Sequence, residues 1–219
     1  MAVEMKCRFV SWDEVVDMCK QLAEKIEENG YIPEVMVGLA RSGFVPSRIL
    51  SDLLGVTNLV ALKVEHWLDT TGEHKDEATI PYEFPLPVEG KKVLVVDDIV
   101  DTGKSMEVSV GYLRRFKPST LKTAVMQYIT SSQHVPDYYA VKVEGWTWFI
   151  YPWNVYEDLS NLTGRLLKAS GKPLTLQELL EGFSEKFELK VDGKLLGEVL
   201  RRMERRGKIV GEGEAWRLP

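Results

Sequence analysis

The sequence lacks the features that mark secreted, membrane-bound and metal-cluster proteins. Of its 219 residues only two are cysteine, Cys7 and Cys19, and their spacing matches no metal site or redox pair. We therefore expect both to be packing residues in a reducing compartment. No apolar run approaches membrane-spanning length and the first residues lack an apolar signal core, so we expect a cytoplasmic protein. The net charge of −5 argues against nucleic acid or an anionic membrane as the main partner.

The composition fits one folded domain with a small appendage. The apolar fraction of 44% is enough to build a buried core. Charge is uneven, because residues 1–164 carry a net −8 and residues 165–219 a net +3. A turn-rich segment, "KASGKP" at 168–173, lies at this change. We therefore predict a main domain over 1–165 and a small module over 166–219.

Apolar segments with strand character alternate with amphipathic segments along the first 130 residues. The pattern predicts helices at 11–29, 46–54 and 104–116, and strands at 34–40, 58–64, 92–97 and 120–128. Such alternation is typical of an α/β fold with a mostly parallel central sheet flanked by helices. Ligands of these sheets bind beyond the carboxyl ends of the strands. The loops that start there are 40–46, 65–79 and 97–105.

One stretch, "VLVVDDIVDTGKSM" at 93–106, places three acids beside groups suited to an anion. Asp97 and Asp98 end a buried strand, where carboxylates can accept from vicinal hydroxyls or attract Mg²⁺. The following "TGKS" opens a helix, whose N-terminal N–H groups suit a phosphate. It is not a Walker loop, because the upstream glycine is missing. The stretch therefore indicates a phosphorylated sugar as ligand, with an ordinary helix cap and solvated acids as the alternative.

The whole stretch resembles the phosphoribosyl-pyrophosphate (PRPP) binding motif of type I phosphoribosyltransferases. Three further segments resemble the same family in the same order. "VGLARSGFVPSRILSDLLG" is similar to its pyrophosphate loop and following helix, and "EHWLDTTGEHKDEAT" at 65–79 falls where the family has its flexible catalytic loop. "WTWFIYPWN" is similar to the base-binding segment of bacterial xanthine–guanine enzymes and their archaeal relatives. The resemblance implies the type I fold with its hood over about residues 10–160.

The resemblance also implies transfer of ribose 5-phosphate from PRPP to a purine, with release of pyrophosphate and Mg²⁺ as cofactor. Asp97 and Asp98 would hold the ribose hydroxyls with the metal nearby. Asp101 would face N7 of the purine and manage a proton, and Arg41 would stabilise the leaving group, unless it makes only a surface salt bridge. The 5′-phosphate would be held by Thr102, Gly103, Lys104 and Ser105, and pyrophosphate by Ala40, Arg41, Ser42 and Gly43. The base would contact Tyr128, Trp148, Phe149 and Ile150.

The lid and the assembly are further implications of the resemblance. Loop 65–79 would close over the substrates to exclude water, and its charge and Thr70–Gly72 suit a segment that orders only when substrate binds. A plain solvated loop is the alternative. A homodimer or tetramer acting in purine salvage is expected.

The identity of the purine depends on a missing lysine. Family members that use 6-oxopurines usually carry a lysine that donates to the 6-oxo group, and Tyr128, or a neighbour, takes that position here. No lysine occurs from Thr123 to Val141. Because adenine presents an amino donor there, we favour adenine, with AMP as product. Hypoxanthine, guanine and xanthine remain alternatives, with Lys142 as a substitute donor.

The tail has a pattern of its own. Thr175 and Glu178 form a capping box, two apolar helical stripes follow, and "KIVGEGEAWRL" predicts a hairpin, an order that resembles a winged-helix module. Its cluster of four arginines, Arg201, Arg202, Arg205 and Arg206, could contact phosphates. We favour a solvated face or a protein contact, because acids interleave with the arginines. A PRPP-sensing transcription regulator is therefore a rival function, although the lid-length loop, Arg41 and the aromatic segment favour an enzyme.

Overall fold

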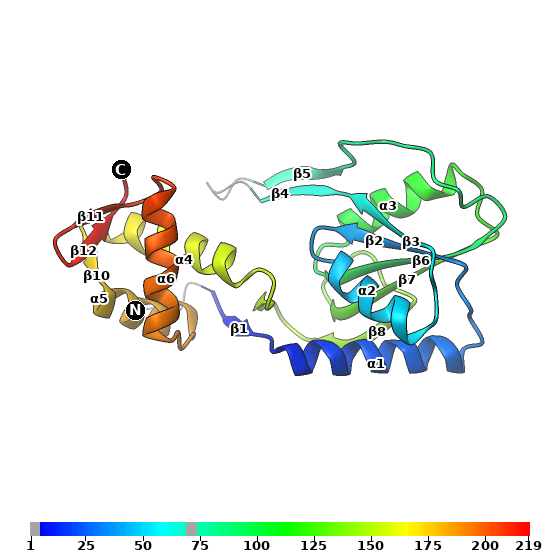
Figure 1. Cartoon of the computed structure of the whole chain (residues 1–219), viewed down its shortest axis with the longest axis horizontal. Coiled ribbons are helices and arrows are strands. Elements are labelled where there is room, and N and C mark those ends of the chain that lie inside the picture. Colours follow the sequence, from blue (N-terminus) through cyan, green and yellow to red (C-terminus); the bar gives the residue numbers. More distant parts are fainter. Residues whose placement is uncertain (1–4, 69–73) are drawn as a thin grey trace. The chain divides into compact units, whose positions relative to one another are not determined.

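The chain folds into two compact units. The computed structural model in Figure 1 describes residues 5–68 and 74–219. The first unit, the sheet unit, is Trp12–Trp146, and the second, the helical unit, joins Met1–Ser11 with Thr147–Pro219. The chain therefore passes between units at residue 147, and the predicted division at 165 falls inside helix α4 (Val155–Ser170). The physical reason is that α4 buries Leu159, Leu162 and Leu166 in one core with the tail.

A five-stranded parallel sheet forms the centre of the sheet unit. Its spatial order is β3-β2-β6-β7-β8, and each neighbouring pair is parallel. The strands are β2 (Val35–Ala40), β3 (Leu59–Lys63), β6 (Lys92–Val100), β7 (Thr120–Ile129) and β8 (Tyr138–Val143). The predicted strands and the predicted α/β class are confirmed, and β8 adds an edge strand. β6 runs three residues beyond the prediction, so Asp97 and Asp98 lie within it.

Helices cover both faces of this sheet, as Figure 1 shows. They are α1 (Trp12–Glu28), α2 (Phe44–Leu53) and α3 (Lys104–Arg114). Val93 and Val95 of β6 pack in one cluster with Met106 and Leu113 of α3. Leu94, which points to the opposite face by strand alternation, is also fully buried. β6 is therefore apolar at consecutive positions because both of its faces are covered.

The segment predicted to be a loop over 65–79 contains a hairpin. β4 (Glu65–Leu68) pairs antiparallel with β5 (His74–Thr79), and Glu65 lies opposite Thr79. The expectation of a segment without secondary structure is therefore wrong for these two stretches. The two strands are short and rich in charged residues, so no regular apolar alternation marks them in the sequence. Thr70–Gly72 lie outside the described residues, and a lid role stays a prediction.

The helical unit combines the first strand with the end of the chain. β1 (Cys7–Phe9) pairs in parallel with β9 (Trp148–Ile150). After α4 come β10 (Leu174–Thr175), α5 (Leu176–Phe187), α6 (Gly193–Arg205), β11 (Val210–Glu212) and β12 (Ala215–Arg217). The last strands form an antiparallel sheet in the order β10-β12-β11. The predicted capping box of Thr175 and Glu178 is present, and helix, helix, hairpin is the predicted order.

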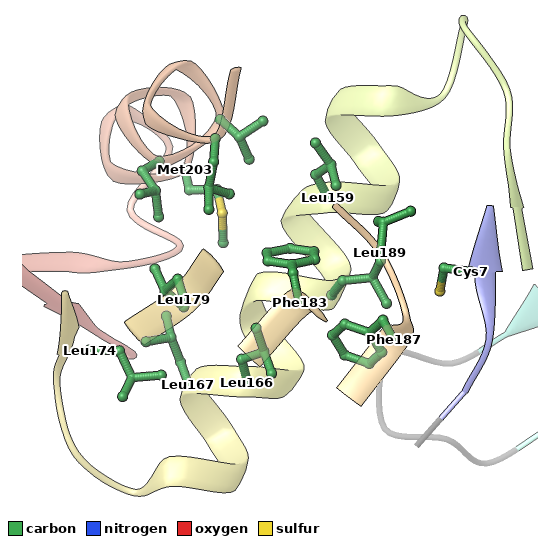
Figure 2. Packing of buried hydrophobic residues seen from close by; sticks show 14 of the residues in the cluster. Cys7, Leu159, Leu166, Leu167, Leu174, Leu179, Phe183, Phe187, Leu189 and Met203 are labelled. Atoms are coloured by element: carbon green, nitrogen blue, oxygen red, sulfur yellow. The ribbon is translucent and has the colours of Figure 1, made fainter. Parts of the chain in front are cut away.

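Aromatic and aliphatic side chains fill the core of the helical unit. Figure 2 shows Phe183 and Phe187 of α5 beside Leu159 and Leu166 of α4. The two phenyl rings meet edge to face, with centroids 5.7 Å apart. α4 thus belongs to the core of the tail. Within the described residues, no helix has the length and apolar character needed to cross a membrane.

Candidate functional site

A loop predicted to bind ligand touches the predicted ribose-binding acids at the carboxyl end of the parallel strands. β2 and β6 are parallel neighbours, so the loop after Ala40 and the end of β6 lie at the same edge. Gly43 is buried against β6: a Cβ added to it would lie 2.6 Å from Oδ1 and 2.7 Å from Cα of Asp97. The structure therefore brings the predicted pyrophosphate loop directly against the predicted ribose-binding acids. Arg41 is exposed in this loop, and the peptide bond from Ala40 to Arg41 is cis.

The paired acids are held by backbone donors. The N–H of Asp98 donates to Oδ1 of Asp97 at 3.0 Å, and the N–H of Ile99 donates to Oδ1 of Asp98 at 2.9 Å. Burial raises the pKa of Asp98 to about 6. Burial, and then the negative charge of Asp98, hold the pKa of Asp97 well above its usual range. Two desolvated carboxyls at one edge favour a ligand that supplies hydroxyl donors or a cation.

Replacing one of these acids should change how stability depends on pH. Because the folded pKa of Asp98 exceeds its unfolded value, the carboxyl favours folding at low pH, and that contribution is lost as pH rises from about 4 to about 6. We expect Asp98→Asn to remove this loss and to raise the free energy of unfolding at pH 7.5 by about 1–3 kcal/mol. Urea unfolding of the wild type and of Asp98→Asn at pH 4.5 and pH 7.5 measures the free energy of unfolding and its dependence on pH.

The control for this prediction is Asp52→Asn, which neutralises an exposed carboxylate of α2. The same pH dependence in wild type and Asp98→Asn would contradict a raised pKa at Asp98. An equal stabilisation by Asp52→Asn would assign the effect to net charge instead.

A second loop, Asp101–Ser105, opens α3. Gly103 is the N-cap of α3 with φ of +90°, a conformation that favours glycine. Oγ1 of Thr102 accepts from the N–H of Lys104 at 3.4 Å, and a carboxylate oxygen of Asp101 accepts from the N–H of Thr102. These contacts fix the loop at a helix N-terminus, where unpaired N–H groups suit a phosphate.

The turn after β7 supports this second loop, which the sequence did not indicate. The N–H of Gln133 donates to the carbonyl of Thr102 at 3.3 Å. A Cβ on Gly103 would lie 2.6 Å from Cβ and 2.7 Å from N of His134, and 2.9 Å from Oγ of Ser132. Burial lowers the pKa of His134. The phosphate-type loop is therefore packed against a turn about thirty residues away in sequence.

The predicted base-binding position Tyr128 is in the core. Its side chain is 7% exposed and packs in the cluster with Val100 and Met106. Its ring lies 5.3 Å from that of Tyr139. Lys142 of β8 is paired with Tyr128 in register, and its side chain is exposed near the carboxyl end of the strand. The structure thus presents Lys142, rather than the ring of Tyr128, to solvent.

The other predicted base-binding residues belong to the helical unit. Ile150 is fully buried, and its carbonyl accepts from the N–H of Val10 at 2.9 Å. The N–H of Trp148 donates to the carbonyl of Lys6 at 2.9 Å. Pairing with β1 therefore occupies these two backbone groups. In a parallel ladder the backbone groups of the intervening Phe149 point away from that partner, and its ring is half-buried.

Comparison with known proteins decides the family. The model of the phosphoribosyl transferase domain matches residues 10–158. The chain belongs to the phosphoribosyltransferase family. The xanthine-guanine phosphoribosyltransferase of Idiomarina loihiensis is 28% identical over 149 residues, covering 68% of this chain and 87% of its own length. The hypoxanthine-guanine phosphoribosyltransferase of Aquifex aeolicus is 35% identical over 111 residues, covering 48% of this chain and 61% of its own.

Solved structures agree with this assignment. The crystal structure of a purine phosphoribosyltransferase from Pyrococcus horikoshii has a TM-score of 0.58 and 30% identity, and the match covers 68% of this chain and 94% of that one. The sheet unit therefore has the type I phosphoribosyltransferase fold, and the chain is a purine phosphoribosyltransferase, a glycosyltransferase. The predicted family is confirmed. The family match ends at residue 158, within α4, and leaves the rest of the helical unit outside it.

Proposed function

We propose that the enzyme transfers ribose 5-phosphate from PRPP to a 6-oxopurine and releases pyrophosphate, as in purine salvage. The observation that carries this proposal is the contact between the Gly43 loop and the Asp97–Asp98 pair, with the Asp101–Ser105 loop following at the end of β6. The Gly43 loop would bind pyrophosphate, the Asp97–Asp98 pair the ribose hydroxyls, and the Asp101–Ser105 loop the 5′-phosphate. The named relatives add that such enzymes act on xanthine, guanine or hypoxanthine.

The chemistry demands charge stabilisation at both ends of the breaking bond. As the bond from C1 of ribose to pyrophosphate lengthens, the sugar gains oxocarbenium character and pyrophosphate gains negative charge. Arg41, exposed in the Gly43 loop, has forked donors that suit pyrophosphate oxygens. Oriented N–H groups of the same loop, at Ser42 and Gly43, would bind further oxygens. These interactions strengthen as charge develops, so they favour the transition state over bound PRPP.

Mg²⁺ fits the acids of the site. Burial raises the pKa values of Asp97 and Asp98, and a bound divalent ion would favour the charged form of both carboxylates. Mg²⁺ favours one or two carboxylates together with substrate oxygens and waters. Asp98 and Asp97 would hold it, and when bound it would neutralise charge on the pyrophosphate. The ribose hydroxyls would donate hydrogen bonds to the remaining carboxylate oxygens of the same two residues.

The proposed choice of a 6-oxopurine revises the expectation of adenine. That expectation depended on Tyr128 standing where relatives carry lysine, but the ring of Tyr128 is buried in the core. Lys142 lies opposite it in register, and its exposed ammonium could donate to a 6-oxo group. Adenine remains a second candidate, because no lysine occurs from Thr123 to Val141. Trp148 and Phe149 remain proposed stacking contacts for the base.

Competition between bases tests this choice. We expect guanine, hypoxanthine or xanthine to be consumed faster than adenine when equal concentrations compete for limiting PRPP with Mg²⁺. Lys142→Gln should reduce that preference at least tenfold, because it replaces the cationic donor with a shorter, neutral amide. Lys168→Gln, which changes an exposed lysine of α4, is the matched control. Faster consumption of adenine by the wild-type protein would restore the adenine assignment.

A further inference from the structure

A row of basic side chains runs along the exposed side of α6. The helix begins after Asp192, whose carboxylate accepts from the N–H of Leu195 at 2.9 Å. Its buried side consists of Leu196, Val199, Leu200 and Met203. Lys194, Arg201 and Arg205 are exposed, and separations of seven and eleven residues bring all three to one side at 3.6 residues per turn. We call these three residues the basic stripe.

The acids that interleave with the arginines are engaged elsewhere. Oε2 of Glu198 accepts from the hydroxyl of Tyr156 at 3.0 Å. Oε1 of Glu204 lies against Gly211 in the hairpin, 2.6 Å from where a Cβ would stand. Among the residues that the structure describes, no carboxylate forms an ion pair with Arg201 or Arg205. The guanidinium groups of Arg201 and Arg205 are therefore not held in ion pairs within the described part of the helical unit.

The helix has the place in the fold that a DNA-reading helix occupies. α5 and α6 are two helices joined by the short connection 188–192, and the β11–β12 hairpin follows. In helix-turn-helix proteins the second helix of such a pair lies in the major groove. The core of Figure 2 includes Met203, which anchors α6 from its apolar side. The opposite, basic side is thus the one available to a ligand.

We propose that the helical unit binds duplex DNA through the basic stripe of α6, mainly by contacts to phosphates. The stripe spans about 16 Å of helix at 1.5 Å per residue, enough to reach several phosphates. Arginine forks match phosphate oxygens, and phosphate contacts supply most sequence-independent affinity. The hairpin carries Glu212 and Glu214, so contact is assigned to the helix alone. The net charge of −5 averages over both units and does not describe this face.

Salt-dependent DNA binding by the full chain tests this proposal. We expect fluorescence anisotropy with a labelled 25-base-pair duplex to show binding whose log K falls with log salt with a slope of about −2 to −3, as for three phosphate contacts. Arg201→Glu with Arg205→Glu should weaken binding at least tenfold. It should also make the salt dependence shallower, reducing the magnitude of the slope by about 2. Lys168→Glu with Lys190→Glu makes the same charge change on exposed residues of the same unit, and should weaken binding less than threefold.

Several results would overturn the proposal. These are no binding by the wild-type protein at 50 mM salt, equal loss in the control variant, or tighter binding to RNA or single strands of equal length. Arg201→Gln with Arg205→Gln, which adds no acid, repeats the test if the reversed variant does not fold. Turnover of PRPP is measured separately, so failure of DNA binding is distinguishable from failure of the proposed transferase reaction.

Discussion

Asp101→Asn is expected to lower kcat by about 10²- to 10⁴-fold, the usual contribution of a positioned general acid or base, while changing the affinity for PRPP less than about threefold. Asp101 lies between the end of β6 and Gly103, and its carboxylate accepts from the N–H of Thr102. Asparagine can accept the same hydrogen bond through its carbonyl oxygen, so the loop should keep its geometry. What it cannot do is take a proton from the purine nitrogen.

Steady-state kinetics measure the loss of kcat, and calorimetry measures the affinity for PRPP, so the two together test this prediction. Asp52→Asn, which removes an exposed carboxylate of α2, serves as the control and should leave both quantities unchanged. If Asp101→Asn kept the wild-type kcat, Asp101 would have no part in proton transfer. If it weakened PRPP binding as strongly as it lowered kcat, its role would be to hold the phosphate loop.

Gly43→Ala should reduce kcat/KM by more than 100-fold, because it separates the Gly43 loop from the acids of β6. The added Cβ would lie 2.6 Å from Oδ1 of Asp97, 2.7 Å from Cα of Asp97 and 2.7 Å from the carbonyl oxygen of Val96. Two of these three atoms are backbone of a central strand, which cannot yield as a side chain can. The loop carrying Arg41 must therefore move away from the acids. Overpacking of this kind should also destabilise the fold by about 1–3 kcal/mol.

The matched control for this change is Gly111→Ala. Gly111 lies within α3, and a Cβ there would meet nothing within 4 Å. Because alanine favours helix more than glycine, this variant should be stabilised by about 0.5–1 kcal/mol and should keep full activity. Denaturant unfolding and initial rates on both variants are the measurement. Near wild-type kcat/KM for Gly43→Ala would show that close contact between the loop and Asp97 is not needed.

The local parts of the site were predictable from sequence. The stretch around Asp97 and Gly103 carries its own signals, since a buried apolar run predicts β6 and a small polar turn predicts the start of α3. The capping box at Thr175 was equally local. Each of these features depends on residues within a few positions of one another, which is the range over which sequence patterns determine backbone conformation.

The parts that sequence could not supply depend on distant partners. Nothing near Gly43 shows that its Cα rests on Asp97, and nothing near Gly103 shows that His134 packs against it. The pairing of β1 with β9 joins segments about 140 residues apart and assigns the first strand to the helical unit. Tyr128 is buried because it packs in one cluster with residues of α3, and the motifs around Tyr128 carry no sign of this packing.

Release of pyrophosphate tests the central claim most directly. The protein of residues 1–219 is mixed with PRPP and Mg²⁺, and pyrophosphate is measured with no base, with adenine, and with each of guanine, hypoxanthine and xanthine. The expected result is little release without a base and rapid release with at least one 6-oxopurine, at a rate that Asp101→Asn lowers by at least 100-fold. No base-dependent release with any of the four purines would contradict phosphoribosyl transfer at this site.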